Sequence, residues 1–388
     1  MKRIIGSPLR YIQGPGEIKN LYKHLKDWGK NFFIIIGPNS AKVVLDDVKQ
    51  SFKKHKGKVV ITTFGGDSTI NHINNLVNQV NKSQCDCVIG IGGGKCADAT
   101  KAVASKTKSN CVIVPTSTSC DAFCAHSAVL YNDKHEFQSV YYPYKSPDLV
   151  IVDSTIIANS PLRLFKAGIG DALSTYIEAR TAWRSGREIN EWKGAPSLSS
   201  YELAKLCYET ILKQGFKACI ACENKVVTQA LEDVIEANIF LSTIGFESSG
   251  LGAAHSIQVG LCTIPEVEKY YHGEVVAFGS LAALVLENAS IEKINKVLQF
   301  LYSIGLPMCL EDIGIKNISK QLLKKVAVVS AVNNIHMYKM PFKVTPEMVE
   351  AAIIVADKFG KYFKDHGKLP GGLNDFGKDC RCNLKNKR

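Results

Sequence analysis

The sequence has no apolar run long enough to cross a membrane. Apolar residues make up 46% of the 388 residues, but no run approaches the roughly 20 consecutive apolar residues that a spanning helix needs. The apolar stretch that follows Met1-Lys2-Arg3 is also too short for the core of a signal peptide. We therefore expect a folded protein of the cytoplasm that has no membrane partner.

Acidic residues are the scarcer charge, with 36 Asp and Glu against 48 Lys and Arg and a net charge of +12. The excess is spread as lysines over many segments, and only residues 378–388 form a basic patch. Nucleic-acid-binding proteins gather their basic residues on one face, so we expect no nucleic-acid partner.

Cysteine is plentiful but gives no sign of a disulfide framework or a zinc finger. The 13 cysteines are an odd count. Without an export signal, this count predicts reduced thiols. Cys219 and Cys222 have the spacing of half a zinc site, but no second pair lies at the required distance. We interpret them as packing residues of a helix.

Short β-branched runs alternate with helical stretches between residues 31 and 153, a rhythm typical of a parallel sheet. The predicted strands are 32–36, 59–64, 87–91, 111–115 and 149–152. The first four end at glycine or proline, where parallel sheets present their ligand-binding loops. The ligand site should lie along that edge.

After residue 160 the apolar spacing changes to three and four, and β-rich runs nearly vanish. Ser160 and Pro161 predict a helix start, with serine as the N-cap and proline as the first helical residue. Further predicted helices are 226–246, 273–288, 291–304 and 345–363. The sequence thus predicts a Rossmann-like α/β domain over 1–158, an all-α domain over 159–366, and a polar basic tail over 367–388.

The strongest phosphate-binding signal is the glycine-rich segment 90–95, GIGGGK, between a predicted strand and a predicted helix. Glycines let backbone amides approach a diphosphate, and the helix presents its positive end to it. The segment has neither the glycine spacing of the common dinucleotide fingerprint nor that of a P-loop. A tight turn from strand to helix is the alternative interpretation.

Asp171, His255 and His272 are candidate metal ligands. Alone, Asp171 could cap a helix, and each histidine could be a packed or surface residue. The histidines are 17 positions apart, so they cannot occupy adjacent turns of one helix. If all three converge, one carboxylate and two imidazoles leave open positions for a substrate oxygen, as expected for catalytic Zn²⁺ or Fe²⁺.

Together these motifs resemble the glycerol dehydrogenases of the iron-containing alcohol dehydrogenase superfamily. The resemblance runs from about residue 8 to residue 364, with its motifs in order. They are segments 90–95, 115–122, 147–153, 168–172, 234–238, 245–248, 253–255 and 271–274.

The resemblance implies a dehydroquinate synthase-like architecture and a role for each matching position. Asp171, His255 and His272 match the metal ligands, and Asp121 matches the residue that binds the polyol. The positions that match cofactor-binding residues are Gly94, Lys95, Thr116, Ser119 and Tyr131. The implied cofactors are NAD, with NADP open, and Zn²⁺, with Fe²⁺ open.

The implied reaction is the NAD(P)-linked oxidation of glycerol to dihydroxyacetone by a homo-oligomer. A related dehydrogenase for another vicinal diol or a hydroxyaldehyde is the alternative. A non-catalytic nucleotide-binding protein is a more distant one.

The chain departs from the family pattern at several positions. Pro38-Asn39-Ser40 and Lys42 follow the first strand in place of an acidic residue that suits the adenosine ribose. Departures near the substrate and the metal are Phe123, Ala125, His126 and Gln258.

Overall fold

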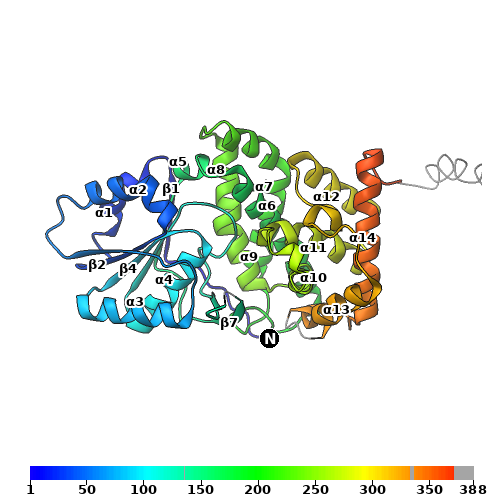
Figure 1. Cartoon of the computed structure of the whole chain (residues 1–388), viewed down its shortest axis with the longest axis horizontal. Helices are drawn as coiled ribbons and strands as arrows, with labels where there is room; N and C mark the ends of the chain where they lie inside the picture. The colour runs from blue at the N-terminus through cyan, green and yellow to red at the C-terminus, as the bar shows by residue number, and fades with distance from the viewer. Residues whose placement is uncertain (135, 333–335, 371–388) are drawn as a thin grey trace, which may run out of the picture. The chain divides into compact units, whose positions relative to one another are not determined.

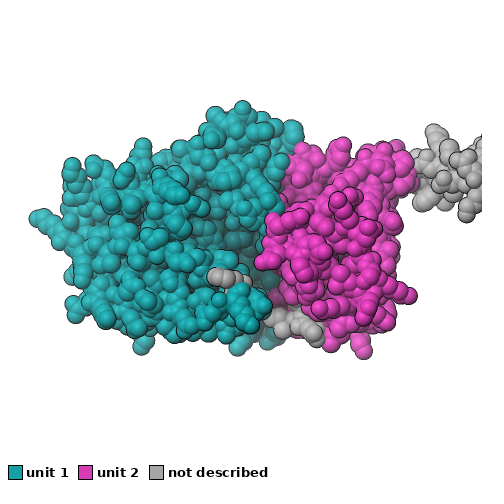
Figure 2. All heavy atoms as spheres, in the orientation of Figure 1, with its two compact units in different colours: residues 1–251, 271–273 teal, residues 252–270, 274–388 magenta. Residues whose placement is uncertain are grey.

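The computed structural model describes residues 1–134, 136–332 and 336–370 (Figure 1). It contains two compact units, residues 1–251 with 271–273 and residues 252–270 with 274–388 (Figure 2). The domain division expected at residue 158 stays a prediction. Most of the expected basic tail, from residue 371 onward, lies outside the described residues.

The first unit contains a six-stranded sheet in the order β1-β8-β5-β4-β2-β3. All of its strand pairs are parallel, which confirms the predicted sheet. The strands are β1 (Arg10–Gly14), β2 (Phe32–Ile36), β3 (Val59–Thr63), β4 (Cys87–Gly92), β5 (Asn110–Pro115) and β8 (Leu149–Asp153). Strand β1 was not predicted, because it is a half-buried edge strand whose polar residues leave no apolar run.

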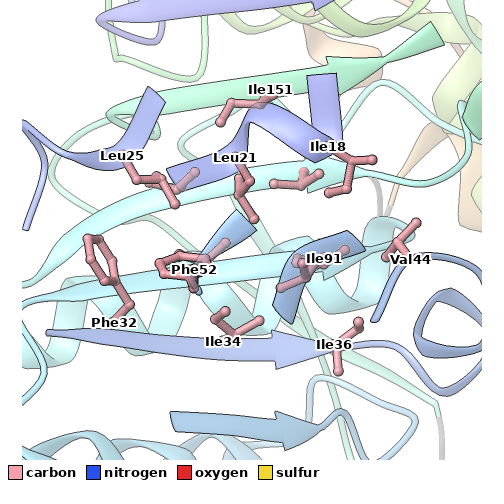
Figure 3. Packing of buried hydrophobic residues seen from close by; sticks show 14 of the residues in the cluster. Ile18, Leu21, Leu25, Phe32, Ile34, Ile36, Val44, Phe52, Ile91 and Ile151 are labelled. Atoms are coloured by element: carbon pink, nitrogen blue, oxygen red, sulfur yellow. The ribbon is translucent and has the colours of Figure 1, made fainter. Parts of the chain in front are cut away.

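Helices cover both faces of this sheet (Figure 1). The short helices η1 (Glu17–Asn20) and α1 (Leu21–Leu25) lie with α2 (Pro38–Ser51) on one face, and α3 (Ile70–Ser83) and α4 (Gly94–Thr107) lie on the other. Alternate strand residues point to opposite faces. Phe32, Ile34 and Ile36 therefore pack with Val44 and Val48 of α2 in one apolar cluster (Figure 3).

The strand order reverses between β2 and β4. Strand β2 is followed by β3 on one side, whereas β4 is followed by β5 on the other. The residue after β2 contacts the end of β4 at this switch point, since the Gly37 N–H donates to the Ile91 carbonyl at 2.9 Å. Open parallel sheets bind ligands at such a point. The glycine-rich segment thus lies at the edge predicted for the ligand.

A short antiparallel hairpin, β6 (Ala128–Tyr131) and β7 (Phe137–Tyr141), interrupts the chain between β5 and β8. It was not predicted, because its strands are short and β7 is largely exposed. A bridge between Thr69 and Tyr131 connects β6 to the start of α3.

The rest of the first unit is helical, and no strand follows residue 153 in the described part of the chain. Its elements are α5 (Ser154–Ala158), α6 (Leu162–Ser185), α7 (Leu198–Glu223), α8 (Gln229–Glu236), the π-helical segment η2 (Ala237–Leu241) and α9 (Ser242–Ser249). The N-cap of α6 is Pro161 rather than Ser160, because the ψ of Pro161 is 125° and the residue is not helical. The helix predicted over 226–246 is α8, η2 and α9 in succession.

The second unit is helical throughout its described residues. Its elements are α10 (Ala253–Leu261), η3 (Pro265–Val267), α11 (His272–Leu286), α12 (Ile291–Ile304), η4 (Leu310–Ile313), α13 (Lys320–Ala331), η5 (Met337–Lys339) and α14 (Pro346–His366). The first two residues of α11 belong to the first unit. The three helices predicted here agree with α11, α12 and α14 within three residues at each end. Among the described helices, none combines the length and apolar character needed to cross a membrane.

Candidate active site

The three predicted metal ligands lie together. Asp171 is in the middle of α6, His255 is in the first turn of α10, and His272 is the first residue of α11. One ligand atom from each residue lies within 4.8 Å of those of the other two. His272 Nε2 is 3.3 Å from Asp171 Oδ1. Asp171 and His255 are buried, whereas the side chain of His272 is 42% exposed, so one side of the cluster is open to a ligand.

Glycines in the flanking motifs allow the close packing that positions these ligands. A Cβ atom on Gly273 would lie 1.8 Å from the Ala167 carbonyl oxygen and 3.0 Å from the Asp171 nitrogen. A Cβ atom on Gly168 would lie 1.6 Å from the carbonyl oxygen of Thr118, in the loop after β5. The start of α11 and this loop therefore contact the backbone of α6 directly.

The donor set fits a divalent metal. Imidazole nitrogens and carboxylate oxygens bind Zn²⁺ at about 2.0–2.2 Å, so ligands of one ion lie up to about 4 Å apart. The three ligand atoms lie within 4.8 Å of one another, close to that range. The same donors suit Zn²⁺ and Fe²⁺, and three protein ligands leave coordination positions for a substrate oxygen.

Asp121 lies beside this cluster, in the loop after β5. Its backbone N–H donates to Asp171 Oδ2 at 3.3 Å. Its carboxylate accepts a 2.7 Å hydrogen bond from Ser242, whose hydroxyl also contacts that of Thr175 at 2.7 Å. The Thr243 hydroxyl donates to the Asp121 carbonyl. The predicted substrate residue is thus fixed at its side chain and at its backbone.

Sequence reasoning missed Ser242, Thr243 and Thr175. Ser242 is 121 positions from Asp121, and it lies in a helical segment whose local pattern gives no sign of a polar partner. Only the three-dimensional structure could have identified this contact.

The two carboxylates create a negative environment for the neighbouring thiols. Burial, together with Asp171 and Asp121, raises the pKa of the Cys120 thiol. The same three causes raise the pKa of Cys207 on α7. Burial disfavours a charge of either sign, whereas the two carboxylates disfavour only a negative charge and so favour a bound cation.

The predicted cofactor residues gather at the carboxyl edge of the sheet. Gly94 and Lys95 begin α4, and no side chain caps this helix at Gly93. The Thr116 N–H donates to the Gly92 carbonyl at 3.1 Å, and the Thr116 hydroxyl contacts that of Ser40 at 2.8 Å. The loops after β2, β4 and β5 are thereby joined around a helix N-terminus that is suited to an anion.

Lys95 and Tyr131, which are far apart in sequence, also come together. The Lys95 ammonium lies 4.6 Å from the centroid of the Tyr131 ring. It also forms an ion pair with Asp67, a buried residue before α3 that sequence reasoning missed. Ser119 is half-buried in the same loop as Thr116.

Gly93 and Gly94 of the glycine-rich segment differ in how much space a Cβ atom would have. A Cβ atom on Gly94 would lie 2.8 Å from Cys120 Sγ, whereas at Gly93 the nearest atom is 3.8 Å away. Gly94 is required for packing in this protein. Gly93 is not required for packing. A close approach of its backbone to a ligand is a different reason for glycine at this position.

The departures from the family pattern have different structural roles. Phe123 is fully buried. His126 stacks on Trp192 at 3.7 Å and pairs with the buried Glu247. Gln258 donates to Cys262 Sγ at 3.0 Å. Lys42 is exposed on the first turns of α2, near the switch point.

Comparisons with known proteins agree with these observations. The family described as iron-containing alcohol dehydrogenase matches residues 8–154. A glycerol dehydrogenase of Escherichia coli O6:H1 is 42% identical over 94% of this chain and 99% of its own length. A glycolaldehyde reductase of Halobacterium salinarum is 35% identical over 94% and 100%. The crystal structure of glycerol dehydrogenase from Schizosaccharomyces pombe superposes with a TM-score of 0.90 at 30% identity, covering 94% of this chain and 93% of the other. The chain therefore belongs to the iron-containing alcohol dehydrogenase family.

Proposed function

We propose that this protein is a metal-dependent, NAD-linked dehydrogenase that interconverts glycerol and dihydroxyacetone. The observation that carries the proposal is the convergence of Asp171, His255 and His272 within 4.8 Å, with Asp121 hydrogen-bonded to Asp171. The glycerol dehydrogenases among its relatives support the choice of substrate.

The metal site and the substrate residue have complementary tasks. Asp171, His255 and His272 would hold a divalent metal, which would supply Lewis-acid polarisation of a substrate hydroxyl group. The Asp121 carboxylate accepts a hydrogen bond from a neighbouring hydroxyl group of the polyol, and Ser242 keeps that carboxylate oriented. A site built to bind two adjacent hydroxyl groups discriminates against alcohols that have only one.

The cofactor residues lie where a dinucleotide would bind in a parallel sheet. We assign the diphosphate to the N-terminus of α4 at Gly94 and Lys95, with Thr116 and Ser119 in the adjacent loop and Tyr131 beside the Lys95 ammonium. NAD supplies the hydride acceptor. The exposed Lys42 and the lack of an acidic residue after Gly37 favour use of NADP as well.

The proposal extends to metal, location and organisation. We assign Zn²⁺ as the metal, with Fe²⁺ as the alternative, and expect a cytoplasmic homo-oligomer. Residues 1–158 would form the nucleotide-binding domain, and 159–366 would form the metal-binding domain.

A second candidate is a dehydrogenase for another vicinal diol or for a hydroxyaldehyde. The similarity to a glycolaldehyde reductase favours this alternative. A non-catalytic nucleotide-binding protein, by contrast, would have no reason to keep three metal ligands together.

The test follows NADH absorbance in enzyme loaded with zinc or iron. The substrates are glycerol, 1,2-propanediol, 2,3-butanediol, glycolaldehyde and dihydroxyacetone, with 1-propanol as the matched monoalcohol. We expect glycerol and dihydroxyacetone to be turned over, and Asp121→Asn to lower kcat/KM for glycerol about 100-fold or more but that for 1-propanol much less. Turnover of glycolaldehyde without glycerol would favour the second candidate. No turnover of any of these compounds would reject both.

A further inference from the structure

Helix α4 carries a buried ion pair that has no part in the site described above. Lys101 and Asp98 are 2% and 5% exposed. They lie on the same helix as the proposed diphosphate residues, and Lys101 Nζ is 2.8 Å from Asp98 Oδ1. Burying two charges costs free energy. This cost is offset only when further hydrogen bonds satisfy the remaining N–H groups and lone pairs of the ion pair.

Those partners are backbone groups of the loop that follows Asp121. Lys101 Nζ donates to the Ala122 carbonyl at 2.9 Å and to the Ser127 carbonyl. With Asp98, these acceptors account for all three N–H groups of the ammonium. The pair therefore holds the segment 122–127 at its two ends.

This segment connects the proposed substrate residue to a proposed cofactor residue. Asp121 immediately precedes it, and Tyr131 follows at the end of β6, four positions after Ser127. Residues 122–127 form neither helix nor strand, so side-chain donors replace the hydrogen bonds of regular structure. At its far end, the buried Glu247 carboxylate accepts the N–H groups of His126 at 2.7 Å and Ser127 at 3.4 Å.

We propose that Lys101 and Asp98 are positioning residues, which hold Asp121 and Tyr131 in a fixed relation to the N-terminus of α4. One helix then begins at the dinucleotide diphosphate and, two turns later, fixes the loop that binds the polyol. The inference rests on the proposed function for the meaning of Asp121 and Tyr131. Lys101 itself contacts the loop backbone and is assigned no contact with substrate or cofactor.

Lys101→Met tests this arrangement because it keeps the length of the side chain and removes its three donors. The matched control is Lys145→Met. Lys145 also forms an i,i+3 ion pair, with Asp148 at 2.7 Å, but no hydrogen bond or ion pair of Lys145 reaches residues 122–129. If Lys101→Met fails to fold, the double variant Asp98→Asn/Lys101→Met removes the charge left behind.

Two measurements distinguish positioning from a general structural role. Hydrogen exchange of the amides in 122–131 should be at least tenfold faster in Lys101→Met and unchanged in Lys145→Met. In a double-mutant cycle, Lys101→Met should lower kcat/KM for glycerol about tenfold in the wild-type background but less than twofold in the Asp121→Asn background. Unchanged loop exchange, or equal losses in both backgrounds, would overturn the inference.

Failure of the proposed function would look different. Wild-type protein that binds NADH and a metal but oxidises no polyol would reject that function. The exchange measurement needs no turnover, so it would still decide whether Lys101 orders the loop.

Discussion

The carboxyl edge of the sheet and the cluster of Asp171, His255 and His272 are built in different ways. At the sheet edge, the residues that follow β2 and β5 meet the end of β4, as in the hydrogen bonds from Gly37 to Ile91 and from Thr116 to Gly92. In the cluster, side chains from three helices converge. A parallel sheet brings its loops together by topology alone, whereas the cluster depends on helix packing that no local pattern specifies.

This difference predicts how each region should respond to substitution. Removing a ligand from the cluster should abolish function with little effect on folding. At the sheet edge, neighbouring glycines differ: Gly94 is closely packed, whereas Gly93 has room and is proposed to lie against the cofactor, so substitutions there should separate packing from binding.

The largest effect is expected at the cluster. Asp171→Asn, His255→Ala and His272→Ala should each lower turnover by more than the 10–100-fold typical of residues that only support metal ligands. Metal content, measured by mass spectrometry, should fall with activity, while affinity for NADH stays within about threefold. His24→Ala is the control, since His24 pairs with Glu17 away from these ligands. A variant with normal metal content and turnover would remove that residue from the site.

The next effect separates packing from binding at the sheet edge. Gly94→Ala places a Cβ atom 2.8 Å from Cys120 Sγ, and should lower the free energy of unfolding by about 1–3 kcal/mol. Gly93→Ala has room and should change it by less than about 0.5 kcal/mol, yet raise the Kd for NADH roughly tenfold by blocking the approach of the diphosphate. Denaturant unfolding and fluorescence titration measure the two quantities. Unchanged NADH affinity in Gly93→Ala would support the tight-turn interpretation instead.

A smaller effect is expected at Lys42. The wild-type preference for NAD over NADP should stay below about 1,000-fold, or roughly 4 kcal/mol, because no acidic residue repels the 2′-phosphate. Lys42→Glu should raise that preference about tenfold. Lys49→Glu makes the same charge change in the last turn of α2 and should leave the ratio of the two kcat/KM values unaltered. Equal ratios in both variants would place Lys42 away from the ribose.

The smallest effect concerns the thiols beside Asp121. Burial raises the pKa of Cys120 and of Cys124, so little reactive thiolate forms near neutral pH. Burial raises the pKa of Cys262 as well, to about 11, but among the cysteines that the structure describes Cys262 alone is exposed. Iodoacetamide should therefore modify Cys262 before the other described thiols, with turnover retained. Peptide mass spectrometry after brief treatment tests this, and early modification of Cys120 together with lost activity would contradict it.

The sequence predicted what depends on local patterns. The strands β2, β3, β4, β5 and β8 agree with their predicted bounds within one residue, because short apolar β-branched runs, the first four of them ended by glycine or proline, specify parallel strands. The motif resemblance identified the three residues that converge in the cluster. The hydrogen-bond partners of the loop after β5 were not predictable, because Lys101, Ser242 and Glu247 come from other helices of the chain.

The π-helical segment η2 has a consequence for the evolution of this site. Its wider turn accommodates one more residue than an α-helical turn would, and such segments are frequent at functional sites. If all residues between Ala237 and Leu241 were kept but the segment became a regular α-helix, Ser242 and Thr243 would rotate by about 100° about the helix axis. Both hydroxyl groups would then turn away from Asp121. A lineage that regularised this helix in that way would gain hydrogen-bond regularity and lose the contacts that orient the Asp121 carboxylate.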